Sequence, residues 1–206
     1  MNSSNFKSVT DCVILAGGKG SRMGIPKALL EINRVPLIQK QFELLSPLFK
    51  HTYVALKDST LLDATPTLPW TGILSDPPES RCLLDVIGNA IREIGRPIFV
   101  AAVDIPLMNP TIINEICSRH KKGVSVIPVD KKRPQPLAAV WDPAALSSIA
   151  PDDGDLALLA WVRRAETTLL DWPTDFPQSI HAENQPEHPF QNLNTPEDLQ
   201  GLETAD

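Results

Sequence analysis

Hydrophobic residues along the first two thirds of the chain alternate between short continuous runs and stretches with helical spacing. The runs with the length and composition of buried strands are residues 11–16, 51–56, 98–103 and 124–129. Apolar residues recur at helical spacing between them, over residues 36–45, 82–94 and 111–119. This βαβαβαβ order predicts an α/β fold: a doubly wound, Rossmann-like, mostly parallel sheet with helices on both faces.

The last third of the chain is less regular. It predicts strands at residues 136–141 and 167–171 and short helices at residues 143–149 and 156–163. Residues 172–190 hold four prolines and few apolar residues, which predicts a segment that runs over the surface. At the end, Thr195 as N-cap, Pro196 as first helical residue and Asp198 three residues after the cap predict a capping-box helix start.

Length and composition favour one globular domain over residues 1–206, with its core in residues 11–203. The chain is 42% hydrophobic and 21% charged, both ordinary values for a folded domain. No apolar run approaches the roughly 18 residues that span a bilayer, and residues 1–10 lack an apolar signal core. We therefore expect a soluble, cytoplasmic protein without a membrane partner.

The cysteines and the net charge argue against disulfides, a zinc site and a nucleic-acid partner. Cys12, Cys82 and Cys117 are odd in number and far apart, which favours free thiols, and neither they nor the histidines have zinc-site spacing. The net charge of −6 argues against nucleic acid as a partner, because a polyanion is repelled by an acidic protein. Any phosphate ligand must therefore be held by local positive charge.

One loop provides such charge. Residues 15–27, LAGGKGSRMGIPK, contain four glycines and three cations, and no carboxylate lies between Asp11 and Glu31. Glycines let backbone N–H groups face an anion, and lysine and arginine add charge, so the loop predicts a triphosphate site. The spacing excludes a Walker loop and a dinucleotide fingerprint. The alternative is that a glycine-rich turn merely joins a strand to a helix.

Four stretches resemble a known family. They are LAGGKGSRMGIPKALL (15–30), AVDIPLM (102–108), QPLAAVW (135–141) and FQNLNTPEDL (190–199). Over about residues 11–203 the sequence is similar to the nucleotidyltransferases related to molybdenum cofactor guanylyltransferase, a branch of the NTP-transferase group that includes sugar-nucleotide pyrophosphorylases. The resemblance implies a single domain of the nucleotide-diphospho-sugar transferase type.

The resemblance also implies roles for the loop. Backbone groups of the first residues would bind the nucleotide and its phosphates; these are Leu15, Ala16, Gly17 and Gly18. Lys27 would contact phosphate oxygens as a catalytic residue and neutralise the charge on departing pyrophosphate. Arg22 and Lys19 are supporting candidates, Arg22 in catalysis and Lys19 in nucleotide binding.

Two aspartates complete the expected nucleotide site. Asp104 follows the apolar strand 98–103, and ligands of open α/β sheets bind at the carboxyl ends of strands. A carboxylate there suits Mg²⁺ together with substrate phosphates, and the resemblance assigns the metal, catalysis and nucleotide contact to Asp104. The alternative is that Asp104 only caps a turn. Asp76 resembles the family's nucleotide-contacting aspartate, although Ser75-Asp76-Pro77-Pro78 is also an ordinary turn sequence.

Acceptor-binding candidates lie in the second half. Gln135, Asn192 and Asn194 stand in the matching stretches. The amides of the two asparagines are suited to orient an acceptor or a metal-bound water; the alternative is that they only cap and turn. Lys131-Lys132-Arg133 is suited to receive an acidic acceptor near Gln135, or is simply a solvated hairpin tip.

The expected reaction is in-line attack of an acceptor phosphate on the α-phosphorus of an NTP, without a protein nucleophile. The resemblance implies GTP as donor, molybdopterin phosphate as acceptor and pyrophosphate as product.

At two places the sequence departs from relatives that use GTP, so the identity of the nucleotide base stays open. Relatives that use GTP carry Gly-Pro-Leu after the Asp76 position and an acidic residue before the loop lysine, where this chain has residues 79–84, ESRCLL, and Pro26. Cytidylyl transfer from CTP and guanylyl transfer to another small phosphate therefore stay as alternatives. A non-catalytic nucleotide-binding protein, or a partner of molybdoenzyme maturation, is the alternative of another class.

Overall fold

A mixed, mostly parallel sheet forms the centre of the molecule. The structure is a computed structural model, which describes residues 8–17, 24–65, 67–76, 82–147, 158–181, 186–194 and 198. The main path of the sheet runs in the order β10 (Thr167–Asp171), β7 (Ser125–Asp130), β9 (Ala138–Trp141), β6 (Ile98–Ala102), β1 (Asp11–Leu15), β4 (His51–Leu56) and β5 (Gly72–Ser75). Short β8 (Arg133–Pro134) pairs with β7. The predicted α/β fold is confirmed, since β5, β4, β1 and β6 are parallel neighbours.

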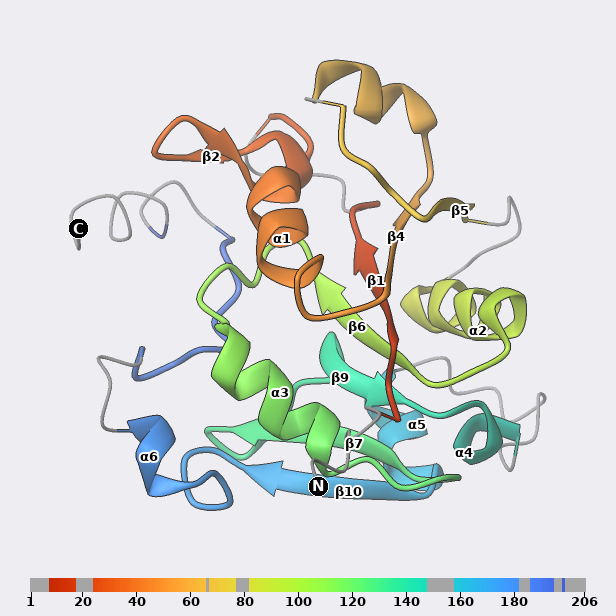
Figure 1. Cartoon of the computed structure of the whole chain (residues 1–206), viewed down its shortest axis with the longest axis vertical. Coiled ribbons are helices and arrows are strands. Elements are labelled where there is room, and N and C mark those ends of the chain that lie inside the picture. The colour runs from red at the N-terminus through yellow and green to blue at the C-terminus, as the bar shows by residue number, and fades with distance from the viewer. Residues whose placement is uncertain are drawn as a thin grey trace, which may run out of the picture.

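Helices cover both faces of this sheet, as predicted (Figure 1). One core contains apolar side chains of α1 (Leu37–Leu45), α3 (Pro110–Ser118) and α6 (Gln178–His181). The other contains those of α2 (Leu83–Ile94), α4 (Pro143–Ser147) and α5 (Leu158–Arg164). Side chains of β1 alternate between them: Cys12 and Ile14 belong to the first core, Val13 and Leu15 to the second. In the described residues, no helix is long and apolar enough to cross a membrane.

β9 departs from a purely parallel arrangement. It lies between β6 and β7 and is antiparallel to both. All four of its residues are buried, so the strand carries no alternating polar face that would reveal its direction from the sequence.

Residues 172–190 run over the surface as predicted, with most of their described polar and proline residues exposed, but the segment is anchored to the core. Their few apolar side chains are buried: Phe176, Ile180 and Phe190 are each no more than 4% exposed, and all three belong to the first core. The segment includes the short α6, and Trp172 packs edge-on against Phe176 and Phe190. The sequence did not predict this anchoring, because three apolar residues spread over the segment form no periodic pattern.

Several short elements have no strong sequence signal. They are β5, the hairpin β2 (Glu31–Ile32) and β3 (Val35–Pro36), and the 3-10 turns η1 (Lys27–Leu29) and η2 (Ser59–Ala64). The hairpin turn places Asn33 and Arg34 at φ 54° and 63°, a left-handed pair that joins two antiparallel strands in two residues. The predicted N-cap Thr195 and first helical residue Pro196 lie outside the described residues.

Candidate active site

A cleft of about 410 Å³ lies at the carboxyl ends of β1, β4, β5 and β6. Five of the residues predicted for the nucleotide site or its chemistry line it: Leu15, Gly17, Lys27, Asp76 and Asp104. They come from four segments of the chain that the parallel sheet brings to one edge. The sheet topology therefore explains why these residues meet.

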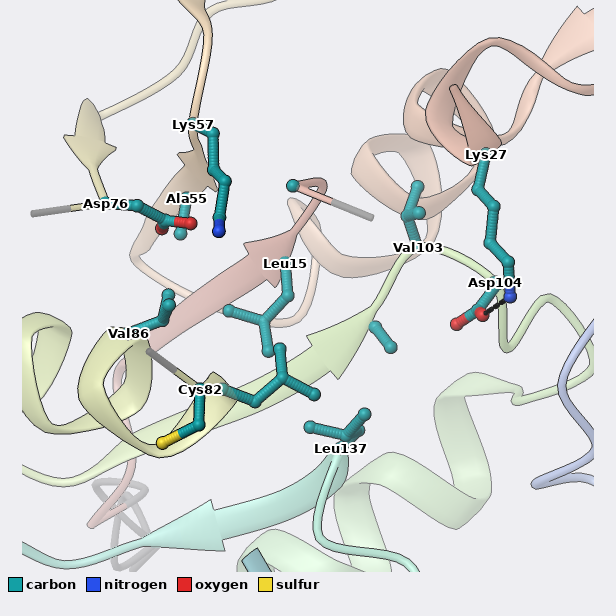
Figure 2. Close-up of a pocket in the computed structure, with 13 residues that line it drawn as sticks. Leu15, Lys27, Ala55, Lys57, Asp76, Cys82, Val86, Val103, Asp104 and Leu137 are labelled. Carbon is teal, nitrogen blue, oxygen red and sulfur yellow. Dashed lines mark hydrogen bonds and ion pairs between the residues drawn. The ribbon is translucent and has the colours of Figure 1, made fainter. Parts of the chain in front are cut away.

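Lys27, Asp104 and Asn194 form a polar cluster beside this cleft. Lys27 Nζ lies 2.6 Å from Asp104 Oδ2 and donates a hydrogen bond of 2.9 Å to Asn194 Oδ1. Figure 2 shows the Lys27 side chain reaching down to the Asp104 carboxylate. One cation thus joins the segment after the glycine loop, the end of β6 and the described segment 186–194.

Local packing fixes the three members of the cluster. Ala28, next to Lys27 in η1, is fully buried, so the turn is anchored and the lysine side chain is left facing the cleft. Val103 N–H donates to Leu15 O at 3.1 Å, which ties the Asp104 turn to the end of β1. Leu193 N–H donates to Asp104 O at 2.8 Å, and this bond brings Asn194 to the site.

The other end of the cleft holds Asp76, Gly17 and a lysine that the sequence analysis missed, Lys57. Asp76 Oδ1 is buried and has no hydrogen-bond partner in the described part of the chain. Burial raises the pKa of the Asp76 carboxyl, and the positive charge of Lys57 opposes this rise. Lys57 follows β4 directly, as Gly17 and Asp76 closely follow β1 and β5. A polar residue after a buried strand was the signal that could have found it.

Gly17 leaves room for these two side chains. A Cβ at this position would lie 3.3 Å from Asp76 Oδ2 and 3.6 Å from Lys57 Cγ. The glycine therefore permits close approach of the charged residues to the backbone of the loop.

The cleft has an apolar lining between its two polar ends. Leu15, Val86 and Leu137 line it, and Figure 2 shows Ala55 and Cys82 among the residues around the same space. The polar groups stand at the rim of this apolar surface, an arrangement that suits a flat heterocycle carrying a charged tail.

Of the other residues predicted for the nucleotide site, one lines a neighbouring cavity and three are not described by the structure. Ala16 is buried, and with Gly17 and Lys57 it lines a neighbouring cavity of about 430 Å³. The predicted phosphate-contacting residues Gly18, Lys19 and Arg22 lie outside the described residues.

The residues predicted to bind the acceptor do not all lie at the same place. Asn194 belongs to the Lys27 cluster, and Asn192 Oδ1 is buried with no hydrogen-bond partner among the described residues. Gln135 is elsewhere: its side-chain amide donates to Arg133 O at 3.1 Å, and it does not line the cleft.

The basic stretch 131–133 forms the tip of the β7–β8 hairpin and is exposed. Lys131 and Lys132 have φ of 49° and 63°, as a two-residue turn requires. Lys131 also lines a separate cavity of about 450 Å³ together with Trp172 and His188. The stretch therefore does not belong to the Lys27 cluster.

The donor set near Asp104 is suited to a hard cation. No group of three or more His, Cys, Asp or Glu side chains within the described ranges is arranged to hold a metal ion. Instead, the carboxylate oxygen of Asp104 and the amide oxygen of Asn194 both face the Lys27 ammonium, so two oxygen ligands converge on one positive charge. A carboxylate with neutral oxygens, completed by substrate phosphates, is what Mg²⁺ prefers.

Known proteins are similar to this chain over most of its length. A family model described as MobA-like NTP transferase domain matches residues 12–168. A curated relative, the probable molybdenum cofactor guanylyltransferase of Chloroflexus aggregans, is 29% identical over 195 residues, which cover 91% of this chain and 90% of the relative.

Solved structures share the fold. Molybdopterin-guanine dinucleotide biosynthesis protein A from Archaeoglobus fulgidus has a TM-score of 0.74 at 22% identity. The match covers 94% of this chain and 97% of the Archaeoglobus chain. A Mycobacterium tuberculosis protein in complex with manganese has a TM-score of 0.57 at 16% identity. The match covers 78% of this chain and 86% of the mycobacterial chain. At these identities the likeness establishes the fold.

Proposed function

Because this chain belongs to the family of MobA-like NTP transferase domains, we propose that it transfers GMP from GTP to the phosphate of molybdopterin and releases pyrophosphate. The chain is a nucleotidyltransferase, and its curated relative is named as a molybdenum cofactor guanylyltransferase. The observation that carries the proposal is the meeting of Lys27, Asp104 and Asn194 beside a cleft of nucleotide size.

The proposed reaction is a single in-line displacement. An oxygen of the acceptor phosphate attacks the α-phosphorus of GTP and forms a new P–O bond. The bond from the α-phosphorus to the oxygen that bridges to the β-phosphorus breaks, and its electron pair leaves on pyrophosphate. Catalysis consists of positioning and charge stabilisation, so no protein side chain needs to become covalently attached.

Lys27 is proposed to bind the phosphates and stabilise the charge that develops on the leaving pyrophosphate. Its side chain is 20% exposed and therefore accessible from the cleft, and its ammonium is a mobile point charge on a flexible stem. Lys19 and Arg22 are proposed to support it, and the backbone of residues 15–18 to hold the nucleotide.

Mg²⁺ is the metal that we propose for this site. The carboxylate of Asp104 would hold it, with the amide oxygen of Asn194 nearby, and a fold neighbour crystallised with manganese supports a divalent cation. When bound, Mg²⁺ supplies positive charge to the phosphate oxygens.

Asn192 and Asn194 are proposed to orient the acceptor phosphate. Both lie on the segment that returns to Asp104, and their side-chain N–H groups are suited to donate to phosphate oxygens. Asn192 Oδ1 is buried and has no hydrogen-bond partner among the described residues, so it is available to a donor group elsewhere on the acceptor. Gln135 has less support as an acceptor residue, because its amide is engaged within its own turn.

The test is a pyrophosphate-release assay with molybdopterin, Mg²⁺ and each of the four NTPs in turn. We expect turnover with GTP, and the dinucleotide product should be identified by its mass. Turnover with CTP alone would make the protein a cytidylyltransferase. Binding of nucleotide without turnover of any NTP would leave a non-catalytic nucleotide-binding protein.

A further inference from the structure

Gln41 is a polar residue on the buried face of α1. The other buried residues of this helix are apolar: Leu37, Ile38, Phe42 and Leu45. Gln41 lies one turn after Leu37 and one turn before Leu45, and it is only 1% exposed, so an amide interrupts an apolar stripe. Burial of an amide costs free energy unless hydrogen bonds compensate it, so the contacts of this side chain indicate what it does.

The Gln41 amide bonds through its donor end. Nε2 donates a hydrogen bond of 2.7 Å to Ile105 O, whereas Oε1 is buried and has no hydrogen-bond partner among the described residues. A carbonyl oxygen only accepts, so it is the NH₂ end of the amide that faces Ile105. Because a buried acceptor without a donor is unfavourable, Oε1 adds nothing to the core, and the defined contact of the side chain is with the loop after β6.

Ile105 O belongs to the turn that carries Asp104. Ile105 follows Asp104 directly and is 1% exposed, so water has little access to replace the Gln41 amide as donor. On the other side of Asp104, Val103 N–H donates to Leu15 O at 3.1 Å. Asp104 therefore lies between two anchored residues, one tied to β1 by its backbone and one tied to α1 by a side chain.

α1 is also the helix that supports the segment of Lys27. It packs against η1, the turn that begins with Lys27, and Leu37 N–H at the start of α1 donates to Leu30 O at 2.8 Å. Figure 1 shows the loop after β6 passing next to this helix. Gln41 thus joins the helix that supports Lys27 to the turn that carries Asp104.

We propose that Gln41 is a positioning residue, which holds Ile105 O and thereby sets the place of the Asp104 carboxylate relative to Lys27. Gln41 is not among the described residues that line the cleft, so it acts through Asp104. Its consequence for turnover rests on the proposed function, whereas its consequence for the 2.6 Å contact between Lys27 and Asp104 does not. Nucleotidyl transfer without a protein nucleophile depends on positioning, and a displacement of about 1 Å can cost about 100-fold in rate.

Gln41→Met tests the proposal in turnover, because methionine has nearly the length of glutamine and cannot donate a hydrogen bond. We expect kcat for GTP with molybdopterin to fall by about tenfold and KM for GTP to change by less than about twofold, since no group that lines the cleft is removed. Gln41→Leu should give the same result, and its side chain continues the stripe of Leu37 and Leu45, which favours folding.

Gln39→Met is the matched control, on the same helix and with the same change of side chain. Gln39 Nε2 donates to Glu43 Oε1 at 2.8 Å in an exposed position, away from the Asp104 turn. This variant should retain the kcat and the KM of the wild-type protein. An equal loss of kcat in Gln39→Met and Gln41→Met would assign the effect to the helix as a whole and overturn the inference.

Asp104→Ala separates positioning from a general structural role. Once the carboxylate is removed, Gln41 has nothing to place, so adding Gln41→Met should lower kcat by less than about twofold further. A general loosening of the fold would instead lower kcat by the same factor of about ten in both backgrounds, and that result would contradict the proposal.

Urea unfolding gives a second readout, which needs neither substrate nor metal. A double-mutant cycle of Lys27→Met and Asp104→Asn measures the coupling of this pair, which we expect to be about fivefold in the unfolding equilibrium constant. In the Gln41→Met background the coupling should fall below about twofold. Full coupling in that background, or none in the wild-type protein, would overturn the inference and leave the proposed function intact. Absence of turnover with every NTP would remove the proposed function, and this cycle would still decide whether Gln41 places Asp104.

Discussion

Lys27 Nζ lies 2.6 Å from Asp104 Oδ2, although the two residues stand 77 positions apart in the chain. The side chains are only 20% and 13% exposed, so their charges interact more strongly than a pair on the open surface. Within this pair the ammonium and the carboxylate neutralise each other. Entry of an anionic triphosphate with a divalent cation would replace this pairing by two new ones, lysine to phosphate and carboxylate to metal.

Replacing Lys27 by Met tests the first of these pairings. The substitution keeps the length of the side chain and removes its charge, so turnover of GTP with molybdopterin should fall by about 10² to 10³, as when a charge-stabilising group is removed from other active sites. The rate of pyrophosphate release at saturating substrates measures it. Lys50→Met should retain wild-type turnover, and a loss of less than about threefold in Lys27→Met would contradict the catalytic role.

The second pairing predicts opposite effects on metal affinity. Asp104→Asn should weaken Mn²⁺ binding by at least about tenfold, because the carboxylate is the only acidic group of the Lys27 cluster. Lys27→Met should strengthen Mn²⁺ binding in the absence of nucleotide, since the ammonium no longer competes for Asp104. Free Mn²⁺ can be titrated by electron paramagnetic resonance without any turnover. The same affinity in both variants and the wild type would place the metal elsewhere.

Much of the fold could be predicted because its central strands are continuous apolar runs. Residues 51–56 and 167–171 were predicted with the bounds that the structure gives them. β5 was missed because it has only four residues, of which Ile73 is 48% exposed and just Leu74 is buried, so it lacks an apolar run. The direction of β9 depends on a reversal after β7 that hydrophobicity alone does not encode.

The residues of the site also fall into those that the sequence predicts and those that it does not. Lys27 and Asp104 lie in recognisable motifs, and the structure brings both to one edge of the sheet. Lys57 lies in no motif. Its place directly after β4 can be predicted from the apolar run, but its proximity to Asp76 depends on β5 pairing beside β4, a long-range contact that local sequence does not show. Gln135 lies in a motif, yet its side chain bonds within its own turn. Sequence motifs identified the end of the cleft that holds Lys27 and Asp104 better than the end that holds Lys57 and Asp76.

The three cysteines allow nucleotide binding to be followed chemically. Cys82 is partly exposed and lines the cleft, whereas Cys12 and Cys117 are buried, and burial raises the pKa of the Cys12 thiol to about 12. We therefore expect iodoacetamide to label the native protein at Cys82, while Cys12 stays protonated and unlabelled up to about pH 9.

GTP should protect that cysteine. A concentration ten times the dissociation constant should slow labelling by about tenfold, because only the unliganded fraction exposes the thiol. Peptide mass spectrometry identifies the modified residue, and Cys82→Ser should abolish labelling of the native chain. An unchanged labelling rate at saturating GTP would mean that the nucleotide does not occupy this part of the cleft.

Asp76 should lower the stability of the ligand-free fold at neutral pH. Burial raises the pKa of its carboxyl above the ordinary value of 3.8, so the folded state holds the proton more tightly than the unfolded state. Above the raised pKa the folded state must carry a poorly solvated charge; below 3.8 the group is protonated in both states and the difference disappears. Asp76→Asn should therefore raise the free energy of unfolding at pH 7.

Urea unfolding at pH 7 and at about pH 3 measures this difference. The gain from Asp76→Asn should be present at pH 7 and absent at the lower pH, since the other carboxyl groups titrate alike in both proteins. Lys57→Met should act in the opposite direction at pH 7, because it removes the positive charge that partly offsets the burial of Asp76. If Asp76→Asn instead destabilised the protein at pH 7, the carboxylate would be stabilising the fold, and its Oδ1, which has no partner among the described residues, would no longer indicate a ligand.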